Sequence, residues 1–199
     1  TPMGGFQGSL ASVSATDLGA ITIAEAVKRA GLQPADVQEV IMGNVLPAGL
    51  KQGPARQAMR KAGLPDHTGA TTINKLCGSG MKAAMFAHDL IKAGSNDIMV
   101  AGGMESMSNA PYILQGVRSG YRMGPGQAPQ DHMFLDGLED AETGKLDLFT
   151  GLEGLDHQLQ SAFDERRTVL PRQSDLVVNR LAKISSRQSR ALHPYPAPR

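Results

Sequence analysis

The chain has 199 residues, enough for one sizeable core or two small domains, and its formal net charge of +1 provides no overall attraction to nucleic acid or membranes. It shows no apolar run of about 18 residues and no secretory leader, so we expect a cytoplasmic protein with neither membrane nor nucleic-acid partners. The single cysteine, Cys77, cannot form an internal disulfide, so it is either a small buried apolar residue or a reactive thiol.

Helical and strand patterns alternate in the first part of the chain. Thr16 can cap a helix that ends at Gly31, with four apolar residues recurring at helical spacing: Leu18, Ile21, Ala24 and Val27. A strand is predicted over 37–45, after the break at Pro34. The next helix begins at Pro54, whose ring suits a first helical turn, and ends at Gly63.

The alternation continues with a second strand over 71–77, in which β-branched residues come first. A helix is predicted over 81–93, and a short apolar strand over 97–101 stops at Gly102-Gly103. Strands separated by helices of this length indicate right-handed βαβ units. The fold class is therefore α/β with a mostly parallel sheet.

The regular pattern weakens after this strand. Residues 102–151 are rich in Gly, Met, Pro and Asp, and we expect a long, partly irregular segment of the kind that often carries a binding site. All 23 glycines lie before residue 157. Residues 157–199 instead carry eight basic and three acidic side chains, a net charge of +5, and end in a proline-rich stretch. We expect this atypical Arg- and Pro-rich tail to be poorly ordered or to form only isolated helix.

The residues with the clearest chemical signal surround Cys77. A strand leads through a glycine-rich turn into a helix, over the run Asn74-Lys75-Leu76-Cys77-Gly78-Ser79-Gly80-Met81-Lys82-Ala83. A helix N-terminus carries about half a positive charge and unpaired N–H groups, which stabilise a thiolate and the oxyanion of a tetrahedral intermediate. Cys77 is therefore the candidate catalytic nucleophile, and its own backbone N–H is a candidate oxyanion donor. The alternative is a small buried residue at the end of a strand.

The histidines do not offer an obvious base for Cys77. His88 lies eleven residues into the following helix, about 16 Å along its axis, and His67 precedes the strand, so it should lie near the opposite end. His132 and His157 could approach only through the fold.

Other polar and sulfur side chains are predicted to be structural. Lys75 and Lys82 fit a solvated face better than a phosphate site. Met99, Met104 and Met107 are expected to pack in a core or a subunit contact, and no metal site is predicted. Glu105 is expected to accept structural hydrogen bonds rather than act as an acid or base.

Several segments resemble the thiolase family, and they occur in the family's order. Besides 74–83 they are Thr1-Pro2-Met3-Gly4-Gly5-Phe6, Gly8-Ser9-Leu10, Val40-Ile41-Met42-Gly43-Asn44-Val45, Gly53-Pro54-Ala55-Arg56-Gln57, the run 100–112, and 118–140. The resemblance implies a thiolase N-terminal α/β half over 1–112, with the family's first strand missing. It also implies the start of a coenzyme A-binding loop domain over 113–156.

The resemblance implies acyl transfer through Cys77. Thiolases condense two acetyl-CoA molecules to acetoacetyl-CoA, and run the thiolytic reverse, through an acyl-cysteine. Coenzyme A thioesters would be the substrates, no cofactor would be bound covalently, and the full-length family forms homo-oligomers. Lys75 and the run Gly80-Met81-Lys82-Ala83 are more similar to acetoacetyl-CoA thiolases than to the alternative, the 3-ketoacyl-CoA thiolases of fatty-acid degradation. The resemblance does not identify the residues that would bind coenzyme A.

The sequence also departs from the family. Thiolases use a His in a Gly-His-Pro motif, a second Cys and an Asn in an Asn-Glu-Ala-Phe-type motif, and none of these occurs in the 199 residues. His193, in Leu192-His193-Pro194, lacks the preceding glycine. We therefore expect a truncated or frame-changed product, an incomplete and catalytically inactive fragment, or a pseudo-enzyme that pairs with a thiolase subunit. A ketosynthase-type condensing enzyme, which shares the fold, is a further alternative.

Overall fold

A four-stranded sheet lies at the centre of the computed structural model, which describes residues 1–121, 123–124, 128–144, 146 and 177–180. The strands are β1 (Glu39–Gly43), β2 (Gly69–Ile73), β3 (Ile98–Gly103) and β6 (Val177–Arg180), in the order β2-β1-β3-β6. β1 runs parallel to both β2 and β3, so that Ile41 lies opposite Thr71 on one side and Ala101 on the other. The predicted α/β fold with a mostly parallel sheet is confirmed.

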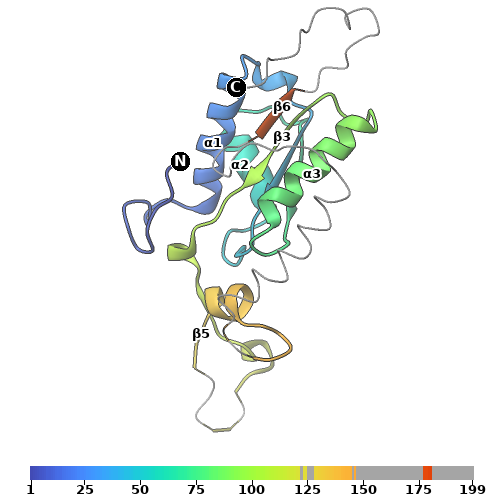
Figure 1. Ribbon diagram of the computed structural model, residues 1–199. Coiled ribbons are helices and arrows are strands. Elements are labelled where there is room, and N and C mark those ends of the chain that lie inside the picture. The colour runs from blue at the N-terminus through green and yellow to red at the C-terminus, as the bar shows by residue number, and fades with distance from the viewer. Residues whose placement is uncertain (122, 125–127, 145, 147–176, 181–199) are drawn as a thin grey trace, which may run out of the picture.

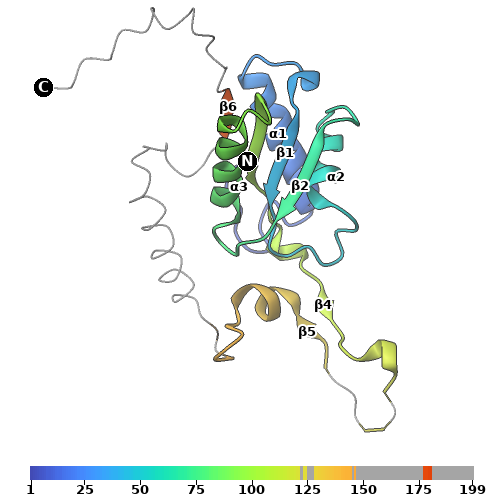
Figure 2. The ribbon, with the colours of Figure 1, turned by 90° about the vertical axis from the view of Figure 1, so that its right-hand side faces the viewer.

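Three helices cover the two faces of the sheet. Figures 1 and 2 show α1 (Ala15–Arg29) and α2 (Pro54–Lys61) on one face and α3 (Ser79–Lys92) on the other. Successive strand residues point to opposite faces, so Val40 and Met42 pack with α1 and α2, while Ile41 packs with Ala83 and Ala87 of α3. Because both faces are covered, β1 is a continuous apolar run rather than an alternating one.

The first helix differs from its prediction in two respects. Its N-cap is Ser14, whose Oγ accepts a hydrogen bond from the Asp17 N–H at 3.2 Å, rather than Thr16. The buried face also differs, since Ile21 is 56% exposed whereas Gly19 is buried. A Cβ on Gly19 would lie 3.1 Å from the Ala58 Cβ, so a small residue here allows α1 to approach α2 closely. The apolar periodicity favoured the larger side chains and missed this contact.

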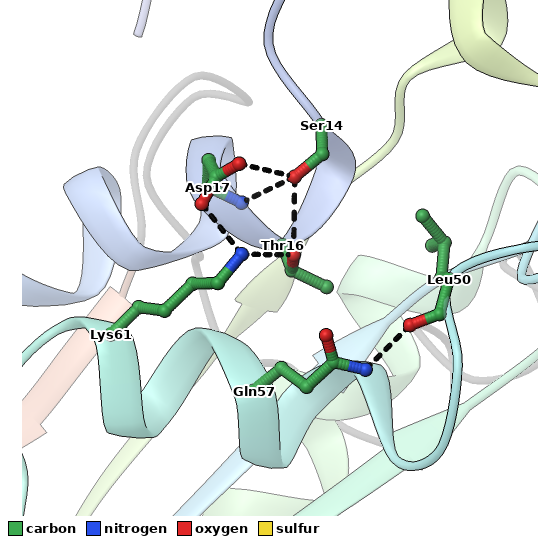
Figure 3. A network of polar contacts seen from close by, with 6 residues as sticks. All are labelled: Ser14, Thr16, Asp17, Leu50, Gln57 and Lys61. Atoms are coloured by element: carbon green, nitrogen blue, oxygen red, sulfur yellow. Dashed lines mark hydrogen bonds and ion pairs between the residues drawn. The ribbon is translucent and has the colours of Figure 1, made fainter.

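Polar contacts also join α1 to α2, as Figure 3 shows. The Lys61 Nζ donates to the Asp17 Oδ1 at 2.6 Å and to the Thr16 Oγ1 at 2.9 Å. The hydrogen bond from Lys61, with a second one from Ser14, lowers the pKa of the Asp17 carboxyl below its ordinary value of 3.8. Thr16 therefore binds a neighbouring helix instead of capping its own.

The other element boundaries agree with the predictions to within a few residues. β1 is shorter than the predicted 37–45, and β3 continues to Gly103. β2 ends at Ile73 rather than residue 77, and α3 begins at Ser79, two residues before the predicted start at Met81. These last two differences leave a turn over 74–78, which contains Cys77.

The segment after the body, residues 112–146, which we call the excursion, has little regular structure among its described residues. Its two short antiparallel strands are β4 (Tyr112–Ile113) and β5 (Gln130–Asp131). A 3-10 turn over Val117–Ser119 and a π-helical segment, η4 (Met133–Leu138), complete it; two further 3-10 turns, Pro34–Asp36 and Met107–Asn109, belong to the body. Figures 1 and 2 show the excursion extending away from the sheet, in agreement with the predicted irregular segment.

The predicted tail over 157–199 lies outside the described residues, except for β6. Val177–Arg180 pairs antiparallel with β3, with Val178 opposite Val100. For these four residues a paired strand replaces the expected isolated helix, and the β-branched Val177 and Val178 favour that conformation. Among the described helices, none has the length and apolar character needed to cross a membrane.

Candidate active site

Cys77 is exposed, in the turn that joins β2 to α3. Gly78 caps α3 and Ser79 is its first residue, so the helix begins two residues after the cysteine. The predicted location at a helix N-terminus is confirmed. The alternative, a cysteine buried at the end of a strand, is wrong, since the strand ends four residues earlier and the side chain meets solvent.

The turn before Cys77 has an unusual backbone conformation. Leu76 has a φ of 46°, in the left-handed region that side chains other than glycine disfavour. The Asn74 Oδ1 accepts a hydrogen bond from the Leu76 N–H at 2.9 Å. The Ser79 Oγ accepts one from the Lys75 N–H at 2.8 Å and donates one to the Leu76 carbonyl at 2.6 Å. Side-chain oxygens from both ends of the turn therefore hold its backbone.

The amide groups that follow Cys77 are partly committed to the turn. The Gly78 N–H donates to the Lys75 carbonyl and the Ser79 N–H to the Leu76 carbonyl, both at 3.0 Å. The first hydrogen bond of the helix runs from the Lys82 N–H to the Gly78 carbonyl at 2.9 Å. The expectation that the helix start offers several unpaired N–H groups therefore fails for Gly78 and Ser79. The dipole of α3, a helix of 14 residues, still points its positive end at the turn.

Close packing of backbone fixes the start of α3 against the sheet. A Cβ on Gly43, the last residue of β1, would lie 2.5 Å from the Ser79 Cβ and 2.8 Å from the Gly80 nitrogen. A Cβ on Gly80 would in turn lie 3.6 Å from the Gly103 nitrogen, at the end of β3. The ends of two parallel strands thus support the helix start next to Cys77.

A second polar cluster lies just beyond the ends of β1 and β3. The Glu105 carboxylate accepts hydrogen bonds from the Val45 N–H at 2.7 Å, the Leu46 N–H at 3.1 Å and the Asn44 Nδ2 at 2.7 Å. Burial raises the pKa of the Glu105 carboxyl above its ordinary 4.5, although these donors and the nearby His132 oppose the rise. Glu105 is a structural acceptor, as predicted.

The described histidines make their contacts away from the cysteine. The Nδ1 of buried His132 lies 2.6 Å from the Asp136 Oδ2, and its Nε2 accepts a weak hydrogen bond from the Ala48 N–H at 3.4 Å. His88 contacts Asp89, and exposed His67 precedes β2, as predicted. Within the described ranges no histidine hydrogen-bonds to Cys77. His157 and His193 lie outside them.

The methionine and lysine side chains singled out in the sequence have contacts or exposure that need no role in chemistry. Met99 and Met104 are buried in the core, as predicted, whereas Met107 is 49% exposed, which leaves the predicted subunit contact as the alternative for it. Lys82 lies over the Phe86 ring at 4.4 Å, and Lys75 is exposed. A shallow hollow along α2, lined by Gln52, Gly53, Arg56, Gln57, Arg60 and Lys61, does not include Cys77.

Sequence reasoning missed the part that Ser79 takes in this site. The sequence places the serine within a glycine-rich run, and in the structure it joins two residues of the turn to the helix. The available signal was its type and place, because serine at a helix start commonly bonds to nearby backbone.

Comparison with known proteins supports a single family. The family described as thiolase, N-terminal domain, matches residues 1–154. Acetyl-CoA acetyltransferase 2 of Arabidopsis thaliana is 56% identical over 140 residues, which cover 70% of this chain and 34% of the relative. Acetyl-CoA acetyltransferases of Cupriavidus necator and Escherichia coli are 55% and 53% identical, over 70% and 72% of this chain and 35% and 36% of the relatives. The chain thus spans about a third of the length of the curated relatives it matches.

Proposed function

Because the chain belongs to the thiolase family, we propose that Cys77 accepts the acyl group in acyl transfer from coenzyme A thioesters. The observation that carries the proposal is the exposed thiol, two residues before a helix start that the ends of β1 and β3 support. The similar proteins named acetyl-CoA acetyltransferase support acetyl-CoA as the donor.

The first step of the proposed reaction is acylation of the cysteine. The Cys77 thiolate attacks the carbonyl carbon of acetyl-CoA, a carbon–sulfur bond forms, and coenzyme A leaves as its thiol after taking a proton. The dipole of α3 stabilises the attacking thiolate. The Cys77 N–H belongs to the same residue as the nucleophile and serves as a donor to the oxyanion.

The second step would form a carbon–carbon bond. A second acetyl-CoA loses a proton from its methyl carbon, the resulting enolate attacks the acyl-cysteine, and Cys77 leaves as acetoacetyl-CoA forms. The reverse sequence is thiolytic cleavage. This step needs a group that takes the proton, and the 199 residues contain no second cysteine to supply the one that the family uses. We therefore propose that this chain alone acylates Cys77 once and does not turn over.

Intact-mass spectrometry with acetyl-CoA tests the first step. The expected result is one added acetyl group, release of one equivalent of free coenzyme A, and loss of both signals in Cys77→Ala. Absence of an acetyl group on a folded wild-type chain would refute the acyl-acceptor role. It would favour the second candidate, a non-catalytic thiolase-like chain that acts by pairing with a thiolase subunit.

Two further measurements sharpen the proposal. Acylation by octanoyl-CoA at a rate equal to or above that of acetyl-CoA would favour a 3-ketoacyl-CoA thiolase of fatty-acid degradation over the acetoacetyl-CoA type. Steady cleavage of acetoacetyl-CoA in the presence of coenzyme A, abolished in Cys77→Ala, would overturn the single-acylation proposal.

A further inference from the structure

We infer that Ser79 is a positioning residue for Cys77. Its hydroxyl binds the backbone of Lys75 and Leu76 and so fixes the turn, while the thiol itself stays exposed. This inference rests on the proposed role of Cys77. Ser79 is 4% exposed and lies at the start of α3, two residues after the cysteine. Its hydroxyl therefore acts from inside the protein on a thiol that faces solvent.

The hydroxyl makes two bonds that together close a small ring around Cys77. It accepts from the Lys75 N–H at 2.8 Å and donates to the Leu76 carbonyl at 2.6 Å. A hydroxyl that both donates and accepts can bind an N–H and a carbonyl at once, which an apolar side chain cannot do. The two residues before the cysteine are thereby tied to the residue two positions after it.

The conformation of Leu76 explains why the ring is needed. A left-handed leucine is disfavoured, and the Leu76 side chain is 48% exposed, so core packing does not hold it. The Asn74 Oδ1 and the Ser79 hydroxyl are the side-chain groups that bind its backbone. If Leu76 returned to the extended region, the chain direction at Cys77 would change and the thiol would move relative to the start of α3.

The serine also has a packing role that the test must separate from positioning. The Ser79 Cβ packs against Gly43 at the end of β1, and a Cβ built on Gly43 would lie 2.5 Å from it. Ser79→Ala keeps this Cβ and removes only the two hydroxyl bonds. Ser95→Ala, on an exposed serine beyond the far end of α3, is the matched control.

The measurement is the alkylation rate of Cys77 by iodoacetamide between pH 6 and pH 10, on the full chain. Since the chain has one cysteine, the signal comes from a single site. We expect Ser79→Ala to lower the rate at pH 7 by about three- to tenfold and to change it less than about twofold at pH 10. Ser95→Ala should follow the wild type at every pH.

The outcomes are distinct. A folded Ser79→Ala chain, with wild-type circular dichroism and a wild-type rate profile, would overturn the inference. If Ser79→Ala does not fold, Ser79→Gly decides, because it removes the same two hydroxyl bonds together with the Cβ that packs against Gly43. A wild-type profile in that variant would overturn the inference, and a reduced rate at pH 7 would support it. Failure of acetyl-CoA to acylate wild-type Cys77, with a reduced alkylation rate in Ser79→Ala, would refute the proposed function alone.

Discussion

The body of the protein and the excursion are held together in different ways. The body has two clusters of buried apolar side chains, one on each face of the sheet. In the described part of residues 112–146, His132 is the one buried residue, and several large apolar side chains are exposed: Tyr112, Leu114, Val117, Tyr121, Met123, Phe134 and Leu146. The comparison indicates that apolar burial determines the structure of the body, whereas hydrogen bonds and turns determine that of the excursion.

The largest expected difference between the two regions is in the loss of stability when a methionine is replaced by alanine. Met59 is fully buried among the residues that join α1, α2 and β1, and Met123 is 96% exposed. We expect Met59→Ala to lower the free energy of unfolding by about 2–5 kcal/mol, through lost contacts and an unfilled cavity. Met123→Ala should change it by less than about 0.5 kcal/mol. Urea denaturation of both variants checks this, and equal losses would contradict the comparison.

Glu105, at the boundary between the two regions, should have an intermediate effect that depends on pH. Glu105→Gln replaces an acceptor with an amide whose NH2 must face one of three donors, which costs about 1–3 kcal/mol. Because burial raises the Glu105 pKa, the folded protein keeps a proton that the unfolded chain loses above about pH 4.5. The stabilising contribution of this carboxyl is therefore complete below pH 4.5 and is lost as the pH rises through the raised pKa.

The loss of unfolding free energy in Glu105→Gln, relative to wild type, should thus be largest near pH 4.5 and smaller at pH 7. Urea denaturation at both values, with Glu139→Gln as the control on an exposed carboxylate, measures it. A deficit that grows toward pH 7 would mean that the hydrogen bonds outweigh burial.

His132 tests whether the excursion can loosen while the body stays folded. Its ring contacts Asp136 within the excursion and the Ala48 N–H in the body. We expect His132→Ala to speed trypsin cleavage after exposed Arg118 by about tenfold, with a loss of global stability of about 1 kcal/mol or less. His67→Ala, at an exposed position of the body, is the control. Unchanged cleavage would show that the excursion is held by something other than this histidine.

The smallest effect is expected for the polar contact between α1 and α2. Both the Lys61 and Asp17 side chains are more than two-fifths exposed, so Lys61→Met should cost only about 0.2–1 kcal/mol. Since the Asp17 pKa is lowered, its contribution is present above pH 3.8 and is lost as the pH falls below that value. The variant and wild type should therefore differ at pH 6 and converge toward pH 3, with Lys28→Met as the control. A difference that persists at pH 3 would assign the effect to packing.

The body could be predicted from the sequence because its signals are local. Pro54 begins α2, Gly63 follows its end, and the apolar run of β1 identifies a strand covered on both faces. Errors arose where a tertiary contact decided the outcome. Gly19 is buried because α1 and α2 approach each other closely at this residue. The Thr16 hydroxyl accepts a hydrogen bond from Lys61 of α2 instead of capping its own helix.

The candidate site was predictable in location but not in detail. The cysteine in a glycine-rich run before a helix indicated where the thiol lies, and the structure agrees. The left-handed Leu76 could not be foreseen, because leucine rarely adopts that conformation and the contacts that permit it come from both sides of the turn. The position of His132 depended on how the excursion folds back on the loop after β1, which no local pattern encodes.

The central position of β1 has a consequence for how the protein folds. β1 pairs with β2 and with β3, whose partner residues lie 30 and 60 positions further along the chain. Closing the longer loop costs about 0.6 kcal/mol more in chain entropy, so the β1–α2–β2 unit should assemble first and β3 should dock on it afterwards. Val40→Ala in β1 should then mainly slow refolding, while Val100→Ala in β3 should mainly speed unfolding, as stopped-flow kinetics can show. Cys77, which follows β2, would reach its turn early, but the support of its helix by Gly103 would come only when β3 docks.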